Sequence, residues 1–472
     1  MDLWGVFLKN KILAMHLKTF LLLFFFMGVL VFVSHAQPLP AKKLIEYGWD
    51  YPTVSDLKSN IKQMEKAPFE GVCFSIDKNI YAAFDNTAYP DSKFQFNNLS
   101  GIPWQKFTDN FLIVRGTSLT GAHWLDDKSW DIISQNLQKI SKAVSLTGAV
   151  GIGFDPEYYF KDPTLNPWVY KPEYYNGLSY QEVGGYVRKR GKQFIEALQT
   201  SKPDIKILCF WLLGWVWDQY YRKVPVEKTS MALYPFFIDG MLEGQNSSSE
   251  IIDGNESSYW YQSFIPFVTV GNNIRARESD LIANDMRDRF KKISISQSLF
   301  LDGLYALAPA YDKGVANDAK PRWLRDNLYF ALKSSDEYVW LYDERVNWWN
   351  NSVDPGIINT IEEVKDRVKK EAANNSDVMQ GVSSIPDFKK KEPNTYQGFS
   401  YNYDRRSNII RINLLNPAIN NFQVYENSYP IYNVNNPQSN FTINLQKIYA
   451  HKGNLILVSK DSKGTSSVAF VN

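Results

Sequence analysis

The sequence is poor in the side chains that most often bind zinc or act as a catalytic base. Its 472 residues include two cysteines and four histidines, and two of those histidines fall within the first 36 residues. Cys-rich and His-rich zinc sites and CxxC redox pairs are therefore excluded. A Ser-His-Asp triad would have to use His123, and no Gly-x-Ser-x-Gly turn accompanies it. Acid–base chemistry is left to carboxylates and tyrosines, and we expect neither a metal ion nor a cofactor.

The chain also lacks an excess of charge of either sign. It has 52 basic and 50 acidic residues, and residues 1–36 hold three lysines and one aspartate. Without that segment the two signs are equal in number. Such a balance gives no electrostatic reason to expect nucleic acid or an anionic membrane surface as a partner.

Long apolar runs are absent except near the N-terminus. A short basic region leads into the apolar residues 20–33, and Ser34-His35-Ala36 follows. This pattern is typical of a secretory signal peptide, complete from Met15 onward, with cleavage after Ala36. The apolar run is too short for a comfortable membrane span. We therefore predict a signal peptide over 1–36, a mature chain without a membrane span, and a secreted or periplasmic location.

Residues 37–374 alternate short apolar segments with amphipathic helical patterns. The apolar segments are Lys43–Trp49, Gly71–Ile76, Phe111–Val114, Ala149–Phe154, Ile205–Leu213, Glu250–Asp253, Ile293–Leu301 and Tyr338–Tyr342. Eight strands alternating with helices predict an α/β fold, a (β/α)₈ TIM barrel. No Gly-x-Gly-x-x-Gly follows the first strand, so the alternative, a doubly wound open sheet, has no dinucleotide fingerprint. Cys73 and Cys209 fall on strands that are not neighbours, which predicts free buried thiols.

The character of the chain changes after the last of these helices. Residues 375–397 are polar and indicate a linker. Residues 398–472 contain seven short alternating segments at regular spacing, which predicts a small antiparallel β-sandwich. Such a domain could bind glycan or brace the barrel, and we favour bracing because it contains tyrosines but no tryptophan.

Carboxylates follow several of the predicted strands, where the reacting groups of a barrel lie. The fourth strand ends in Asp155-Pro156-Glu157, and the sixth is followed by Glu256. Aromatic residues make up 15% of the chain, and flat rings stack on the faces of sugars. Paired carboxyl groups and few histidines suit glycoside hydrolysis, which needs one protonated carboxyl and one carboxylate. The predicted catalytic residues are Asp155, Glu157 and Glu256, and the predicted substrate-binding residues are Asp50, Asp253, Glu344, Tyr158, Trp211, Trp215, Tyr342 and Trp349.

Three of these motifs together resemble those of a known group of proteins. Phe154–Glu157, Asp253–Glu256 and Tyr338–Glu344 with Trp348-Trp349 resemble secreted bacterial barrel proteins that are regarded as glycoside hydrolases. The resemblance covers roughly residues 40–370 and implies a carbohydrate substrate without naming the sugar.

The end of the fourth strand has a weaker likeness of its own. Asp155-Pro156-Glu157 is similar to the Asp-x-Glu of chitinase-like family 18 hydrolases, in which the Glu is the acid and the Asp orients an acetamido group. Gly151 and Gly153 stand near the places of that family's two upstream aspartates. This departure puts substrate-assisted catalysis in doubt.

The sequence thus predicts a secreted, monomeric glycoside hydrolase that cleaves a poly- or oligosaccharide. Glu157 or Glu256 is the expected general acid, and Asp155 the nucleophile, the base or a sugar ligand. Two alternatives stay open: a non-catalytic glycan-binding barrel, and a polysaccharide lyase that uses a tyrosine base beside Arg115.

Overall fold

The computed structural model describes residues 41–472 apart from short gaps. The gaps are 262–265, 268–269, 272–273, 276, 306–319, 351, 375–397, 405, 427–428, 446–454, 463–465 and 472. The predicted signal peptide and linker lie outside the described residues.

A parallel sheet with strand order β8-β7-β6-β5-β4-β2-β1-β10-β9 forms the first part of the chain. Its strands are β1 (Lys43–Gly48), β2 (Gly71–Phe74), β4 (Phe111–Arg115), β5 (Gly151–Asp155), β6 (Lys206–Cys209), β7 (Glu250–Asp253), β8 (Ser294–Ile295), β9 (Gln297–Phe300) and β10 (Tyr338–Asp343), and β3 (Tyr81–Ala82) pairs with β4. β8 pairs with β7 and β9 pairs with β10, and only Ser296 separates them. The two ends of the sheet therefore meet in one stretch of chain, which makes an eight-stranded ring.

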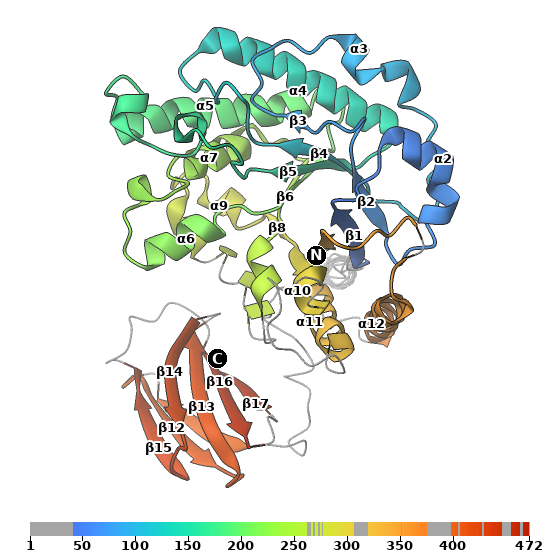
Figure 1. The fold of residues 1–472 in the computed structure, drawn as a ribbon. Helices are drawn as coiled ribbons and strands as arrows, with labels where there is room; N and C mark the ends of the chain where they lie inside the picture. Colours follow the sequence, from blue (N-terminus) through green and yellow to red (C-terminus); the bar gives the residue numbers. More distant parts are fainter. Residues whose placement is uncertain are drawn as a thin grey trace, which may run out of the picture. The chain divides into compact units, whose positions relative to one another are not determined.

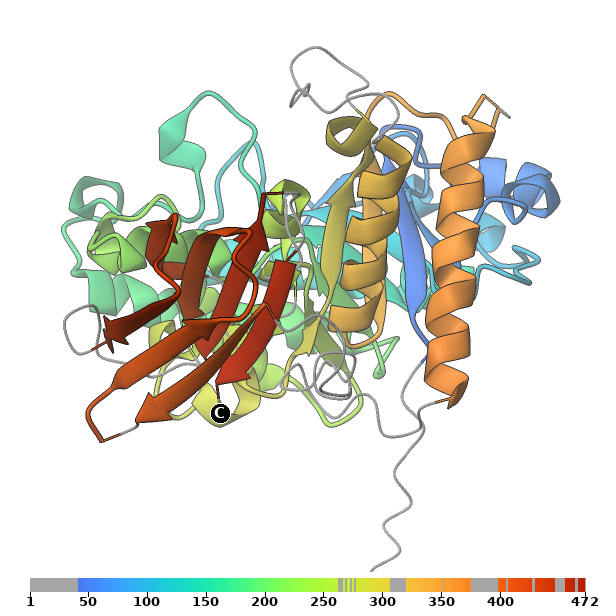
Figure 2. The ribbon, with the colours of Figure 1, turned by 90° about the horizontal axis from the view of Figure 1, so that it is seen from below.

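Helices surround this ring (Figure 1). The longer ones are α2 (Val54–Met64), α4 (Asp127–Thr147), α5 (Tyr180–Leu198), α6 (Gly214–Tyr221), α7 (Tyr234–Gly244), α11 (Lys320–Ser334) and α12 (Pro355–Asn374), and the shorter ones are α3 (Asp91–Phe94), α9 (Arg287–Phe290) and α10 (Leu301–Tyr305). Figure 2 shows α11 and α12 side by side outside the strands. Parallel strands with helices outside them fit the predicted TIM barrel.

The amphipathic patterns explain why these helices form. Thr53 and Asp56 make a reciprocal capping box at the start of α2, and its buried residues recur at helical spacing. α5 begins with the same device, in which Ser179 and Glu182 cap each other.

Alternation along β5 decides which of its side chains face the barrel interior. Phe154 packs against Phe194 and Phe237, whose helices lie outside the ring, with ring centroids 5.2 and 6.5 Å away. Gly153 and Asp155 therefore point inward. A methyl group on Gly153 would stand 3.2 Å from the Phe210 ring.

Gly151 is required for a different reason. A Cβ there would lie 1.7 Å from the carbonyl oxygen of Lys206 on the next strand. No side chain fits at this position, so the structure gives the likeness to chitinase-like hydrolases no support.

The strands lie at the predicted segments, but several end earlier: β2 ends at Phe74 rather than Ile76, and β6 ends at Cys209 rather than Leu213. The seventh segment was expected to run as a strand to Leu301, but Ser296 interrupts it and α10 begins at Leu301. Cys73 and Cys209 are buried and free, as predicted. Within the described ranges, no helix is both long and apolar enough to cross a bilayer.

The C-terminal part contains two antiparallel sheets, ordered β11-β12-β15 and β14-β13-β16-β17. Their strands are β11 (Phe399–Asp404), β12 (Ile409–Leu414), β13 (Ile419–Glu426), β14 (Tyr429–Asn435), β15 (Asn440–Asn444), β16 (Leu455–Asp461) and β17 (Ser466–Val471). One apolar cluster draws side chains from both sheets, and Phe422 of β13 lies 4.9 Å from Phe399 and 5.2 Å from Phe441. All seven predicted strands are present.

Candidate active site

Asp155 is the last residue of β5, and strand alternation directs its side chain into the barrel mouth. It is 5% exposed, and both carboxylate oxygens accept hydrogen bonds. The backbone N–H of Glu157 donates to Oδ1 at 3.0 Å, and the Tyr159 hydroxyl donates to Oδ2 at 2.9 Å. Burial raises the pKa of Asp155 to about 6, while these two bonds and Arg115 act in the opposite direction. Asp155 is thus a carboxyl that ionises just below neutral pH.

Glu256 enters the same mouth from β7, two strands away in the sheet. The chain turns sharply at Gly254, where a Cβ would stand 2.6 Å from two carbonyl oxygens of β6 and the residue after it. Asn255 then adopts a left-handed conformation with φ 44°, and the N–H of Glu256 donates to the Phe210 carbonyl at 3.1 Å. These contacts fix Glu256 as the first residue of the 3₁₀ helix η5 (Glu256–Trp260).

The two strand ends interact electrostatically. Burial raises the pKa of Glu256 to about 8, and the negative charges of Glu157 and Asp155 add to the effect. Like charges that share a site push one carboxyl toward its protonated form. At neutral pH the mouth therefore holds a protonated Glu256 beside an ionised Asp155, which is the arrangement that a general acid and its partner require.

Aromatic rings form the floor beneath these carboxyl groups. Tyr47 stacks on Phe210 at 4.5 Å, and Phe210 stacks on Trp340 at 4.6 Å. Tyr259 and Tyr342 lie nearly parallel at 5.7 Å. The Tyr342 hydroxyl accepts from Trp49 Nε1 at 2.9 Å and donates to Glu344 at 3.3 Å. These largely apolar rings raise the cost of a charge on the carboxyl groups near them.

A second set of carboxyl groups lies behind the strands: Glu46 and Asp343 are on the outer faces of β1 and β10, Asp50 follows β1, and Asp302 is in α10. Glu46, Asp302 and Asp343 are all 0% exposed, and Asp50 is half-buried beside them. Trp348 donates from its backbone to Asp50 at 2.8 Å and from its indole to Asp343 at 2.7 Å. Burial and neighbouring acids raise the pKa of Asp343 to about 8 and that of Glu46 well above its ordinary value.

This outer set is separate from the mouth, because residues one apart on a strand point to opposite faces. Tyr342 belongs to the aromatic floor, so Asp343 faces the other way. Asp50 also accepts the Trp349 indole N–H through its backbone carbonyl at 2.8 Å. The bonds described for Asp50 and Trp349 thus tie loops together.

The other predicted binding residues divide between the mouth and its surroundings. Trp215 is 39% exposed and stacks on the buried Trp211 at 4.9 Å. Tyr158 donates to the backbone carbonyl of Asp162 in its own loop. Asp253 is buried on the outer face of β7, accepts from the N–H of Asn255 at 2.8 Å and has a pKa raised by burial to about 6.

The main residues of the mouth that the sequence analysis missed are tyrosines. Tyr47, Tyr159 and Tyr259 surround the mouth, and none was among the predicted site residues. Tyr159 could have been found, because it directly follows the two carboxylates in sequence. The other two depend on the inward register of β1 and on the η5 turn. Among the described residues, no group of three or more His, Cys, Asp or Glu side chains could hold a metal ion.

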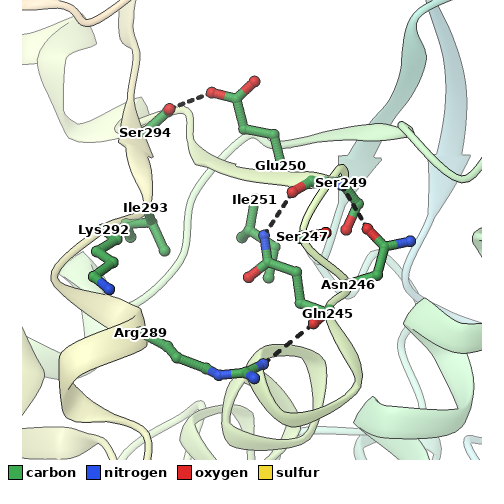
Figure 3. Close-up of a pocket in the computed structure, with 10 residues that line it drawn as sticks. All are labelled: Gln245, Asn246, Ser247, Ser249, Glu250, Ile251, Arg289, Lys292, Ile293 and Ser294. Carbon is green, nitrogen blue, oxygen red and sulfur yellow. Dashed lines mark hydrogen bonds between the residues drawn. The ribbon is translucent and has the colours of Figure 1, made fainter.

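A cavity of about 390 Å³ lies at the opposite end of the strands (Figure 3). Glu250 and Ser294, the first residues of β7 and β8, line it. Arg289 donates to the carbonyl oxygens of Leu242 and Gln245 at the end of α7, at 2.5 and 3.2 Å. A cation that caps a helix end at the amino-terminal face of a barrel indicates a role in stability.

No family model and no curated protein matches the sequence. Among solved structures, the chain is similar to several enzymes. They include a mutant of Bacteroides uniformis beta-glucuronidase 2 (8% identity, 92% of this chain and 45% of that one, TM-score 0.35), an endo-beta-1,4-mannanase double mutant of Cellulomonas fimi (9%, 92% and 94%, 0.34) and a glucosidase from Croceicoccus marinus (9%, 86% and 93%, 0.36). The chain spans less than half the length of the glucuronidase. These similarities do not bear on the activity of this chain, which we argue from the strand ends alone.

Proposed function

We propose that the protein is a glycoside hydrolase in which Glu256 is the general acid. The observation that supports this best is the pairing of a carboxyl with a pKa of about 8 and a carboxyl with a pKa of about 6 at one barrel mouth. Between those values one group holds its proton and the other is ionised, which is the division of roles that glycoside hydrolysis needs.

In this proposal the proton of Glu256 passes to the glycosidic oxygen as the bond from C1 to that oxygen breaks. Asp155 supplies the opposite function, either by bonding to C1 or by taking a proton from the water that attacks it. The Tyr159 hydroxyl holds Oδ2 of Asp155, so one oxygen has a fixed direction. Glu157 accepts a hydrogen bond from a hydroxyl group of the substrate, and its negative charge keeps Glu256 protonated.

A lyase would need a tyrosine that gives up its proton. Arg115 does lie 5.5 Å from the Tyr159 ring, as a basic partner should. However, burial and the charge of Asp155 raise the pKa of Tyr159 far above its ordinary value. A tyrosine that holds its proton this firmly is a poor base, so we favour hydrolysis over elimination.

The test uses the chain from residue 37 onward against a panel of plant, algal and host glycans, with reducing-end and mass analysis of the products. Glu256→Gln keeps the shape and removes the acid, and should lower the rate by about 10²- to 10⁴-fold. Glu173→Gln changes an exposed carboxylate in the loop after β5 and is the matched control. Full activity of Glu256→Gln on an identified glycan contradicts the proposal, and binding without turnover across the panel supports the glycan-binding alternative.

We also propose that residues 1–36 direct secretion and that the two C-terminal sheets pack face to face as a sandwich. The first rests on the sequence pattern alone. The second is supported by the ring contacts of Phe422, a residue of one sheet, with Phe399 and Phe441 of the other.

A further inference from the structure

A cavity of about 470 Å³ opens beside the carboxyl ends of β6 and β7. Trp215 and Trp217 of α6 line one side, and Asn255, Tyr261 and Glu278 are among the residues that line the rest. Asn255, the residue before Glu256 in the chain, lines it, and the Asn255 amide donates to Gln297 at 2.8 Å and to the Tyr261 hydroxyl at 3.3 Å. The volume is within the range of small-molecule sites in proteins.

Two buried polar atoms in the lining have no hydrogen-bond partner. Glu278 is 3% exposed, and its Oε2 is unpartnered, while Trp217 is 7% exposed with an unpartnered Nε1; each of these two atoms exposes less than 1 Å² of surface. Buried polar groups are rarely left unpaired, and an unpaired one calls for an explanation such as a ligand. Burial and the neighbouring Asp253 raise the pKa of Glu278 well above its ordinary value, so its carboxyl can both donate and accept.

The cavity offers little to hold a charged ligand. Among the described residues that line it there is no lysine or arginine, and its remaining carboxylate, on Asp218, is bridged to Arg222 at 2.9 Å. A buried uronate or sulfate would therefore have no counter-ion. An ammonium group could donate to Glu278 but could not accept the indole N–H of Trp217.

The position of the Trp215 ring also favours a sugar. Trp215 is 39% exposed and is held by stacking on Trp211, with an interplanar angle of 9°. A flat, pre-positioned ring suits the C–H face of a sugar, because it buries apolar area with little loss of entropy.

We propose that this cavity binds a neutral pyranose unit of the glycan next to the one that reacts at Glu256. The ring lies along Trp215, and its hydroxyls bond to Trp217 Nε1 and to Glu278 once binding displaces the side chains that cover these atoms. The assignment rests on the proposed function for the reaction at Glu256, and it adds that the substrate is a neutral glycan in this position.

Binding is measured in a Glu256→Gln background, which should bind without turnover, by titration calorimetry of the chain from residue 37 onward. The probes are neutral gluco-, manno-, galacto- and xylo-tetraoses, a tetragalacturonate and a glucosamine tetramer. At least one neutral tetraose should bind more than tenfold more tightly than the acidic and amino probes. Glu278→Met and Trp217→Phe should each weaken that binding at least tenfold, while Glu227→Met, which changes an exposed carboxylate in the loop after α6, should change it less than twofold.

Three results overturn the inference: equal or tighter binding of the charged probes, unchanged binding in both cavity variants, or no measurable binding of any neutral tetraose. If Glu278→Met fails to fold by near-ultraviolet circular dichroism, Trp217→Phe decides the question, because it keeps an apolar ring. With an identified substrate and native Glu256, the cavity variants should raise KM far more than they lower kcat. Retained hydrolysis in Glu256→Gln would refute the catalytic proposal instead, so the two failures are distinguishable.

Discussion

The pH dependence of the reaction offers the sharpest test of the barrel mouth. With Asp155 titrating near 6 and Glu256 near 8, kcat/KM should follow a bell with its maximum close to pH 7. The limbs belong to the interacting carboxyl groups as a set, because they titrate together. Replacing Glu157 by Gln removes a charge that raises both pKa values, so both limbs should move to lower pH.

The structure bounds the size of this movement. The pKa of Glu256 rises from an ordinary value of 4.5 to about 8, a difference worth about 5 kcal/mol. Burial is the largest cause and Glu157 the second, so the Glu157 charge accounts for at most half of the rise. We therefore expect the alkaline limb to move by about one pH unit in Glu157→Gln.

The assay is an initial-rate series from pH 4 to 10 at low substrate concentration and constant ionic strength. Glu173→Gln, which removes an exposed charge outside the mouth, should leave both limbs in place. An alkaline limb that stays where it was in Glu157→Gln would mean that the titrating acid is not Glu256, and the assignment would have to be abandoned.

Three further predictions concern neighbouring groups. Tyr159→Phe removes a hydrogen bond that lowers the pKa of Asp155, so the acid limb of the same profile should move to higher pH. Gly151→Ala places a methyl group 1.7 Å from a carbonyl oxygen and should destabilise the fold by about 4 kcal/mol or more in urea unfolding, whereas Gly185→Ala, an exposed helix site with open space, should stabilise it by about 0.5–1 kcal/mol. Folded Asp343 keeps its proton up to about pH 8, whereas an aspartate in the unfolded chain loses it near pH 4. This difference stabilises the fold fully below about pH 4, and the stabilisation is lost as the pH rises to about 8. In Asp343→Asn this loss should be smaller by up to about 1.4 kcal/mol per pH unit within that window.

Each of these has an outcome that would contradict it. An acid limb that moves down in Tyr159→Phe would show that the tyrosine does not stabilise the charged form of Asp155. Equal stability of the two glycine variants would refute the close approach of β5 to β6. Parallel stability curves for the wild-type chain and Asp343→Asn would show that Asp343 is ionised in the folded protein.

Much of the barrel could be predicted from the sequence because its strands are short apolar segments bounded by turns. The seventh segment shows where that approach ended. Residues 293–301 were predicted as one strand, yet Ser296 separates the part that pairs with β7 from the part that pairs with β10. The exchange of partners is a property of ring closure, and nothing local in the sequence marks it.

The site was harder to predict than the fold, because a sequence shows that a carboxylate ends a strand without showing which face it takes. Asp155 and Asp343 both end strands, yet one faces the aromatic floor and the other the outer layer with Trp348. The neighbours Phe154 and Tyr342 carry the missing information, since one packs on outer helices and the other on the floor. The face that each carboxylate takes can be assigned from such packing partners only when the fold is known.

The same alternation explains how one small barrel can hold so many acids without charging its interior. Asp155 and Glu256 share the mouth, where their pKa values differ by about two units. One group can therefore hold a proton for the substrate while the other is ionised. Glu46 and Asp343 lie behind the strands, where burial keeps them protonated and hydrogen bonding to Trp348 holds Asp343 in place. If the outer acids were ionised at neutral pH, their charge would act on the mouth through a low-dielectric sheet and raise both mouth pKa values. Neutral outer acids therefore leave the pKa values of Asp155 and Glu256 to be set by each other, by Glu157 and by burial.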